Sequence, residues 1–261
     1  MTLAFSVDRT VEIRASCATV FRFFTDPARW ARWWGEGSTI DPVVGGALLI
    51  VYPGGERVSG VIREIVVDRR LVFSYGYEAA GRPIAPGGSL VTITLSELAD
   101  GATRLELRHD VDRAETRDLH VQGWRHQLAR FADVVAGDAF SGAADAVAAW
   151  FASWNDGDAD HRRATLGAAV RADVRFRDAH GDVYGLDELV NHVGAVLRFM
   201  PGLTLEMRGT VRRSHDVALA DWAAVARDGR VTLSGTNVFR FAADGRICDV
   251  IGVPSPPREV A

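Results

Sequence analysis

The strand-forming segments of this sequence fall into two runs, and this order constrains the fold more than any other feature. In the first run, five alternating segments between residues 47 and 111 are separated by Gly and Pro turns, and one helical pattern follows at about residues 116–136. In the second run, three helical patterns and one strand precede four further strands. Consecutive strands joined by short turns pair antiparallel. We therefore predict an α+β protein with two antiparallel sheets.

The length of 261 residues is sufficient for two domains, each with its own hydrophobic core. A segment rich in Gly, Ala and Ser, "VVAGDAFSGAAD", separates the two runs of strands. We therefore expect one domain at residues 1–138 and a second at residues 139–261. Because each half carries a complete set of strands and helices, we also expect each half to fold independently.

Local sequence signals predict where several helices begin. Ser16 and Ser141 are expected N-caps, and Asp26 is an expected cap followed by Pro27 at the first helical position. Apolar residues that repeat at helical spacing indicate which face of the long helix is buried. These residues are Leu119, Trp124, Leu128, Phe131 and Val135.

The composition argues against several classes of protein. The net charge is −4 and no basic footprint for nucleic acid is present. No apolar run reaches the length of a membrane-spanning helix, and the N-terminal segment lacks signal-peptide features, so we expect a soluble cytoplasmic protein without a membrane partner. All 30 basic residues are arginine, which excludes a catalytic lysine. The seven histidines lack metal-ligand spacing, so we predict neither a metal site nor a cofactor.

The first half contains, in order, "VFRFFTDPARWARWW", "GVIREIVVDRRLVFSY" and "GWRHQLARFADVV". With these motifs, residues 5–137 resemble the START-like (SRPBCC) domains, in the branch related to the activator of the heat-shock protein 90 ATPase. The resemblance implies a helix-grip fold, in which a curved antiparallel sheet wraps around a long C-terminal helix, often with an apolar cavity between them. Members include lipid binders, aromatic polyketide cyclases and self-resistance proteins, so the fold does not define the chemistry.

The second half contains "WFASWNDGD", "VRFRDAHGDVYGLDEL", "MPGLTLEMRG" and "GTNVFRFAADGRICDVIGV". With these motifs, residues 143–253 resemble the SnoaL-like and ketosteroid-isomerase branch of the nuclear transport factor 2-like superfamily. The resemblance implies an α+β cone, in which a bent antiparallel sheet encloses helices and a deep pocket. Several members are cyclases or isomerases that act on enolisable carbon acids. Such domains often dimerise through their sheets, so a homodimer is one expectation.

In the segment "VRFRDAHG", apolar and charged residues alternate, and a carboxylate occupies a position where this pattern predicts a core residue. Val174 and Phe176 share one apolar face of a strand, and Asp178 is the next residue on that face. Asp178 matches the place of the general base in the ketosteroid isomerases, with Ala179 where that family often has Pro. It is therefore either a catalytic base in the pocket or a cap of the following turn.

The strand "VTLSGTNVFRF" carries an amide, Asn237, on an otherwise apolar face. At the corresponding place the isomerases have an acidic residue that donates to an oxyanion. Asn237 can still donate a hydrogen bond but is not a proton source; the alternative is a satisfied wall residue. Trp150 lies near the place of that family's oxyanion tyrosine. Trp150, Trp154, His180 and His192 are candidates for binding substrate, with core packing or an exposed position as their alternatives.

The first half has its own polar residue on an apolar strand face. In "TRLELRHDV", His109 follows Leu105 and Leu107 on that face. Together with Tyr75 on a neighbouring strand and Trp124 on the long helix, His109 could line a cavity of the kind that binds small molecules. The alternative is a filled core with one satisfied histidine.

These features predict a protein that binds a hydrophobic or aromatic small molecule. The leading hypothesis adds catalysis, namely cyclisation, isomerisation or dehydration of a polyketide-like metabolite by proton transfer at a carbon acid. Asp178 would be the base, and Asn237 would stabilise the enolate. The alternatives are a non-catalytic ligand-sequestering or self-resistance protein and a protein-interaction module of the co-chaperone kind.

Overall fold

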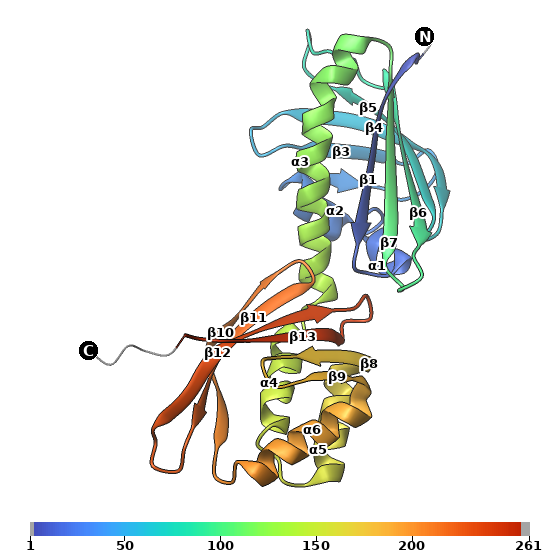
Figure 1. Ribbon diagram of the computed structural model, residues 1–261. Helices are drawn as coiled ribbons and strands as arrows, with labels where there is room; N and C mark the ends of the chain where they lie inside the picture. The colour runs from blue at the N-terminus through green and yellow to red at the C-terminus, as the bar shows by residue number, and fades with distance from the viewer. Residues whose placement is uncertain (1–2, 257–261) are drawn as a thin grey trace, which may run out of the picture. The chain divides into compact units, whose positions relative to one another are not determined.

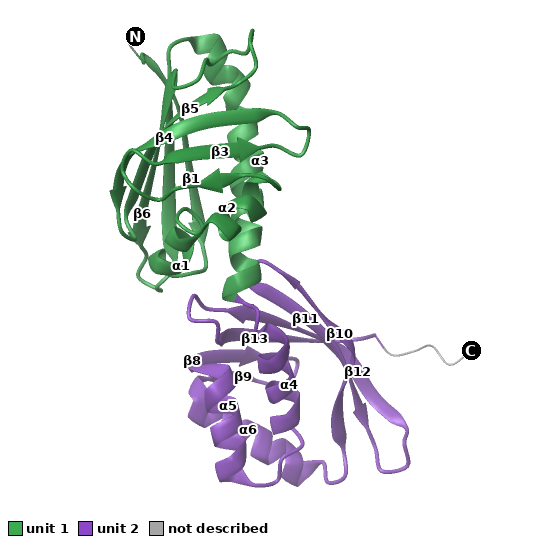
Figure 2. Cartoon of the chain, turned by 180° about the vertical axis from the view of Figure 1, so that it is seen from behind, with its two compact units in different colours: residues 1–139 green, residues 140–261 purple. Residues whose placement is uncertain are grey.

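The computed structural model of the chain describes residues 3–256. The chain divides into two compact units, residues 1–139 and residues 140–261 (Figure 2). Within the described residues, the first unit contains a seven-stranded sheet and the second a six-stranded sheet, each with its own helices (Figure 1). The predicted α+β class with two sheets is confirmed.

The sheet of the first unit is an antiparallel meander closed by the first strand. Its order is β1-β7-β6-β5-β4-β3-β2, so β2 to β7 each pair with their neighbours in sequence and β1 pairs with β7. The strands are β1 (Phe5–Ile13), β2 (Thr39–Ile40), β3 (Ala47–Val51), β4 (Arg57–Val66), β5 (Arg70–Tyr77), β6 (Ser89–Glu97) and β7 (Thr103–Val111).

The helices of the first unit are α1 (Cys17–Arg22), α2 (Pro27–Trp34) and α3 (Ala114–Ala139). Two predicted helix starts are confirmed. The Ser16 hydroxyl accepts the N–H of Thr19 at the start of α1, and the Asp26 carboxylate accepts two backbone N–H groups at the start of α2. The long helix α3 runs alongside the sheet and packs against β1 and β7 (Figure 1).

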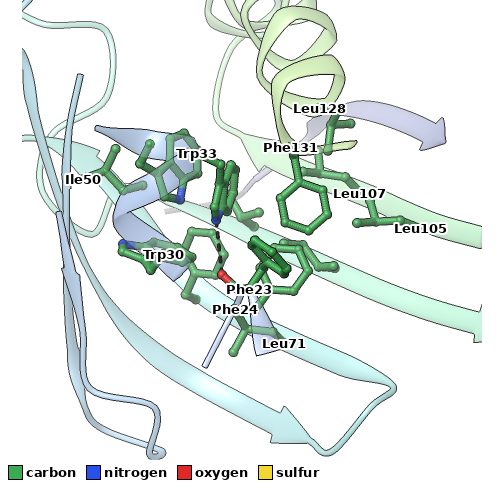
Figure 3. Packing of buried hydrophobic residues seen from close by; sticks show 14 of the residues in the cluster. Phe23, Phe24, Trp30, Trp33, Ile50, Leu71, Leu105, Leu107, Leu128 and Phe131 are labelled. Carbon is green, nitrogen blue, oxygen red and sulfur yellow. Dashed lines mark hydrogen bonds between the residues drawn. The ribbon is translucent and has the colours of Figure 1, made fainter. Parts of the chain in front are cut away.

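The core of the first unit is built from aromatic rings. The ring of Phe131 on α3 stacks on Phe24 with centroids 4.8 Å apart and meets Trp33 edge-on, also at 4.8 Å (Figure 3). The indole N–H of Trp33 donates to the carbonyl of Phe23 at 3.2 Å, so this buried ring has its polar atom satisfied. Three helices thus contribute to one aromatic cluster over the sheet.

The second unit contains α4 (Ala143–Ser153), α5 (Ala159–Ala169), β8 (Val170–Arg177), β9 (Asp182–Tyr184), α6 (Gly185–Phe199), β10 (Thr204–Ser214), β11 (Val217–Val225), β12 (Val231–Phe241) and β13 (Ile247–Pro254). The strand order is β10-β11-β12-β13-β8-β9, and only the β13–β8 pair among the described strands is parallel. The prediction that Ser141 caps α4 is wrong. The cap position is Gly142, which leaves Ser141 one residue too early to bond the first turn.

The register of three adjacent strands determines which residues of the second unit become neighbours. Across the β12–β13 pair Asn237 lies opposite Gly252, and across the parallel β13–β8 pair Ile251 lies opposite Arg177. The next residue after Arg177 is Asp178, so Asn237, Gly252 and Asp178 follow one another across the sheet. Among the helices in residues 3–256, none has both the length and the hydropathy needed to cross a membrane.

Candidate functional site

The second unit contains a cavity of about 190 Å³ between its helices and its sheet. Most of the wall is apolar, with side chains from α6, β8, β10, β11 and β12. Four polar side chains interrupt it: Asp178, His180, His192 and Asn237. An apolar cavity with a few convergent polar groups is the usual form of a small-molecule site.

Gly252 lies between the two predicted catalytic residues, at a place too narrow for a side chain. A Cβ atom placed on Gly252 would lie 3.1 Å from the Cβ of Asp178 and 3.3 Å from Oδ1 of Asn237. Asp178 and Asn237 therefore face the same point of the cavity wall, where the sheet presents backbone instead of a side chain. The structure brings together two residues that lie far apart in sequence.

Asp178 follows β8 directly, in the turn to β9. Its Oδ1 accepts the backbone N–H of His180 at 2.7 Å, and its own N–H donates to the carbonyl of Gly181 at 3.0 Å. The carboxylate thus caps the turn and lines the cavity at once, so the two alternatives from the sequence are compatible. Within residues 3–256, no hydrogen bond engages its second oxygen, Oδ2.

Asn237 is the most deeply buried polar side chain of the cavity, with 5% of its surface exposed. Its amide forms no hydrogen bond with any residue of the described chain, although it lines the cavity. The amide is therefore available for a hydrogen bond with a molecule in the cavity.

The two histidines line the same cavity from different elements. His192 on α6 is half-buried, and its ring centroid lies 5.8 Å from that of Trp154 and 5.6 Å from that of Phe176. Burial lowers the pKa of His192, the charge of Asp178 opposes this shift, and His180 adds to it. His192 is therefore a neutral imidazole at pH 7. His180 lines the cavity from the exposed turn after Asp178.

Of the two tryptophans proposed for this cavity, only Trp154 lines it. Trp150 is fully buried, with its ring 5.4 Å from Phe176 and 5.8 Å from Phe239. The prediction that Trp150 contacts substrate is corrected, because α4 directs this side chain into the core. A further aromatic wall residue, Trp222 on β11, was missed from the sequence, where its strand shows no polar interruption.

The first unit contains its own cavity, of about 310 Å³, beside α3. Of the three residues predicted to line a pocket here, Tyr75 and Trp124 line the cavity, whereas His109 does not. Sequence reasoning missed Tyr52 and His120, which also line it. His120 lies four residues before Trp124, so the shared helix face was a signal that could have identified it.

His109 does not line this cavity and instead forms part of a chain of buried hydrogen bonds that runs from Trp124 to the backbone of Tyr75. The indole N–H of Trp124 donates to its Nδ1 at 2.9 Å, so the ring proton is on Nε2. Nε2 then donates to the hydroxyl of Ser89 at 2.8 Å, and this hydroxyl donates to the carbonyl of Tyr75 at 2.8 Å. The expectation that His109 lines the pocket is corrected to the alternative, a buried histidine with both ring nitrogens satisfied.

This burial makes the stability of the first unit depend on pH. Burial lowers the pKa of His109 from 6.5 to about 3, with a smaller contribution from His120. Because the unfolded state binds a proton below pH 6.5 and the folded state does not, stability present above pH 6.5 is lost as the pH falls toward 3. We expect this group to contribute a loss of about 1.4 kcal/mol per pH unit in that window. Urea unfolding of His109→Gln should show a shallower pH dependence than wild type, while exposed His126→Gln should match wild type.

No group of three or more His, Cys, Asp or Glu side chains in the described part of the chain is placed to hold a metal ion. Nothing in either cavity therefore provides a preformed metal centre within residues 3–256. Carboxylate, amide, imidazole, phenol, indole and guanidinium groups line the two cavities.

Two family models match the chain, one on each side of the boundary between the two compact units. Residues 14–136 match the family model for Activator of Hsp90 ATPase homolog 1-like protein, and residues 147–250 match the model for the SnoaL-like domain. Both resemblances noted in the sequence are confirmed. No curated protein matches the chain.

Three of the solved structures that are similar to the chain each cover about half of it or less. CalU16 from Micromonospora echinospora is 28% identical, over 50% of this chain and 75% of its own, with a TM-score of 0.42. A SnoaL-like family protein from Agrobacterium tumefaciens strain C58 is 24% identical, over 43% of this chain and 96% of its own, with a TM-score of 0.42. The Aha1 dimer from Colwellia psychrerythraea is 16% identical, over 50% of this chain and 96% of its own, with a TM-score of 0.44.

Proposed function

Since the chain joins an Activator of Hsp90 ATPase homolog 1-like domain to a SnoaL-like domain, we propose that its second unit binds an apolar carbonyl compound and transfers a proton at the carbon beside the carbonyl. One observation carries the proposal. The unpartnered amide of Asn237 and the carboxylate of Asp178 lie on either side of Gly252 in the wall of one apolar cavity.

The wall of the cavity selects the ligand. Its aromatic and aliphatic side chains stabilise an apolar body, because removing apolar surface from water is favourable by roughly 25 cal/mol per Å². The Asn237 amide favours a ligand with an acceptor oxygen at the polar end of the cavity. An enolisable ketone supplies both properties. The neutral ring of His192 can bond the same oxygen or a second polar group without introducing charge.

The reaction is a proton transfer that produces an enolate, followed by return of the proton or by closure of a ring. Oδ2 of Asp178 accepts the proton from the carbon beside the carbonyl, and the electron pair of that C–H bond moves to give an enolate. The Asn237 amide donates a hydrogen bond to the enolate oxygen. Return of the proton to a different carbon isomerises the ligand. Alternatively, the enolate carbon attacks a second carbonyl, which closes a ring, and the resulting alkoxide takes the proton back from Asp178.

The proposal is tested with 1-tetralone, an aromatic ketone with acidic protons beside its carbonyl. In D₂O, the loss of these proton signals in ¹H NMR spectra should be faster with the protein than in buffer and should scale with protein concentration. Calorimetry on the same ketone measures binding separately. Binding without accelerated exchange would contradict catalysis and favour a ligand-sequestering protein. Neither binding nor exchange, together with capture of a chaperone, would favour the interaction module.

Gly252→Ala tests the space between the two polar residues. The added methyl group would press on Asp178 and on Oδ1 of Asn237 and would separate them. Overpacking of this kind costs about 1–3 kcal/mol, so we expect the affinity for 1-tetralone to fall about tenfold or more. Gly157→Ala is the matched control, because a Cβ at Gly157 meets no atom within 4 Å. Equal affinities of the two variants would contradict the placement of the ligand beside Gly252.

A further inference from the structure

The cavity of the first unit is lined by a cluster of phenols that the proposed function does not use. The hydroxyls of Tyr52 and Tyr75 lie 3.1 Å apart, and the hydroxyl of Tyr77 lies 3.0 Å from Nε2 of His120. All four side chains line the same cavity of about 310 Å³. The rings of Tyr75 and Tyr77 meet edge-on with centroids 5.7 Å apart, so the two hydrogen-bonded pairs form one cluster.

The hydrogen bonds of this cluster have a defined direction. Nδ1 of His120 lies 2.7 Å from the carbonyl of Thr116, which can only accept, so Nδ1 carries the proton and Nε2 accepts from Tyr77. Burial lowers the pKa of His120, which keeps its ring neutral. In the Tyr52–Tyr75 pair, one proton lies between the two oxygens, and the other is available to a third oxygen.

The hydroxyl pair remains a donor over the whole physiological range. Burial raises the pKa of Tyr52 and raises that of Tyr75 well above its ordinary value of 10. Neither phenol therefore ionises near pH 7. The cavity presents protonated O–H groups, which suit a ligand that brings an acceptor oxygen.

The ionised groups around the cavity favour negative charge on that ligand. Two guanidinium groups, those of Arg82 and Arg130, line the cavity, and Glu56 is its single lining carboxylate. Glu56 is already paired with Arg82, whose guanidinium lies over the ring of Tyr77 at 5.3 Å. The lining arginine and glutamate side chains therefore carry one net positive charge.

The wall behind the phenols is held in place. The indole of Trp124, with its ring centroid 6.4 Å from that of Tyr75, donates to His109, which donates to Ser89, which donates to the carbonyl of Tyr75. This chain of hydrogen bonds holds β5, which carries Tyr75, in place relative to α3, which carries Trp124. A rigid aromatic wall with oriented donors is a preformed site for a planar molecule.

We propose that the first unit holds a second binding site, in which the hydroxyls of Tyr52 and Tyr75 bind the oxygen of an aromatic anion, a carboxylate or a phenolate. The rings of Tyr75 and Trp124 contact its aromatic body, and Arg130 supplies the opposite charge. This site differs from the cavity of the second unit, where an acidic side chain and an amide face a neutral carbonyl compound.

The test is calorimetry on the full chain with 2-naphthoate and its neutral analogue 2-naphthamide. We expect 2-naphthoate to bind at least tenfold more tightly than 2-naphthamide. Tyr52→Phe and Tyr75→Phe should each weaken 2-naphthoate about tenfold or more, because hydrogen bonds to charged groups are the stronger ones. Both variants keep the ring, and an unchanged thermal melt shows that the fold is kept. Asn237→Leu, in the second unit, should leave the affinity for 2-naphthoate unchanged.

Four outcomes would overturn the proposal. These are equal affinity for the two probes, unchanged 2-naphthoate affinity in both tyrosine variants, loss of binding in Asn237→Leu, and no binding at millimolar 2-naphthoate. Failure of this proposal is distinguishable from failure of the proposed function, because the two are tested with different probes. Binding of 2-naphthoate tests the first unit, and exchange of the 1-tetralone protons tests the second. Tyr52→Phe should leave that exchange at the wild-type rate.

Discussion

Replacing Asp178 by Asn should lower the protein-catalysed exchange of the 1-tetralone protons by about 10²–10⁴-fold, the contribution of a general base. Asn keeps the oxygen that accepts the N–H of His180, so the turn after β8 is preserved. The amide fills the same space in the cavity wall but does not accept the proton. We therefore expect the affinity for 1-tetralone to change by no more than about threefold, since the apolar wall supplies most of the binding.

Asp182→Asn is the matched control for this variant. It removes the same charge four residues further along the chain, where the side chain pairs with Arg175 and does not line the cavity. This control should retain the wild-type exchange rate. Wild-type exchange in Asp178→Asn would place the base elsewhere, and loss of exchange in both variants would indicate a general effect of charge.

Phe131→Ala is expected to destabilise the first unit by about 3–5 kcal/mol, the range for removing a fully buried aromatic side chain. The ring of Phe131 has no exposed surface and contacts Phe24 and Trp33 at centroid distances of 4.8 Å (Figure 3). Its loss leaves a cavity between α3 and the two short helices. Urea unfolding followed by tryptophan fluorescence measures the change.

Leu119→Ala provides the control on the same helix. Leu119 is 68% exposed, so this variant should change the unfolding free energy by no more than about 0.5 kcal/mol. Hydrogen exchange resolved by peptide then shows where Phe131→Ala acts. Peptides from residues 3–139 should lose protection, whereas peptides from residues 140–256 should keep it. Equal loss of protection in both ranges would contradict independent folding of the two units.

The exposure of Leu119 corrects one of the five residues predicted for the buried face of α3, whereas the other four are buried as predicted. The apolar spacing placed Leu119 on the buried side, but the buried residues at that end of the helix are Thr116, His120 and Trp124. These three repeat every four residues, so they share one face. The polar atoms of His120 are satisfied by Tyr77 and by the Thr116 carbonyl. Nothing in the sequence indicated that His120 is paired, because its partner on β5 is 43 residues away in sequence.

Features that depend on neighbours in the chain could be predicted from the sequence. Two helix starts were predictable at Ser16 and Asp26, because a capping side chain bonds N–H groups two or three residues away. Strand alternation likewise predicted that Asp178 and Asn237 face an apolar side of the sheet, since successive side chains point to opposite faces. The order of strands and helices predicted the fold class for the same reason.

Which of these residues meet depends on strand pairing and helix packing between distant parts of the chain. Asp178 and Asn237 face one space because the register of β12, β13 and β8 places Gly252 between them. Register also placed His109 beside Ser89, where both its ring nitrogens are satisfied, and so removed it from the cavity wall. These contacts join residues far apart in sequence. Their geometry follows from strand pairing and from how the helices pack on the sheet, which no local pattern encodes.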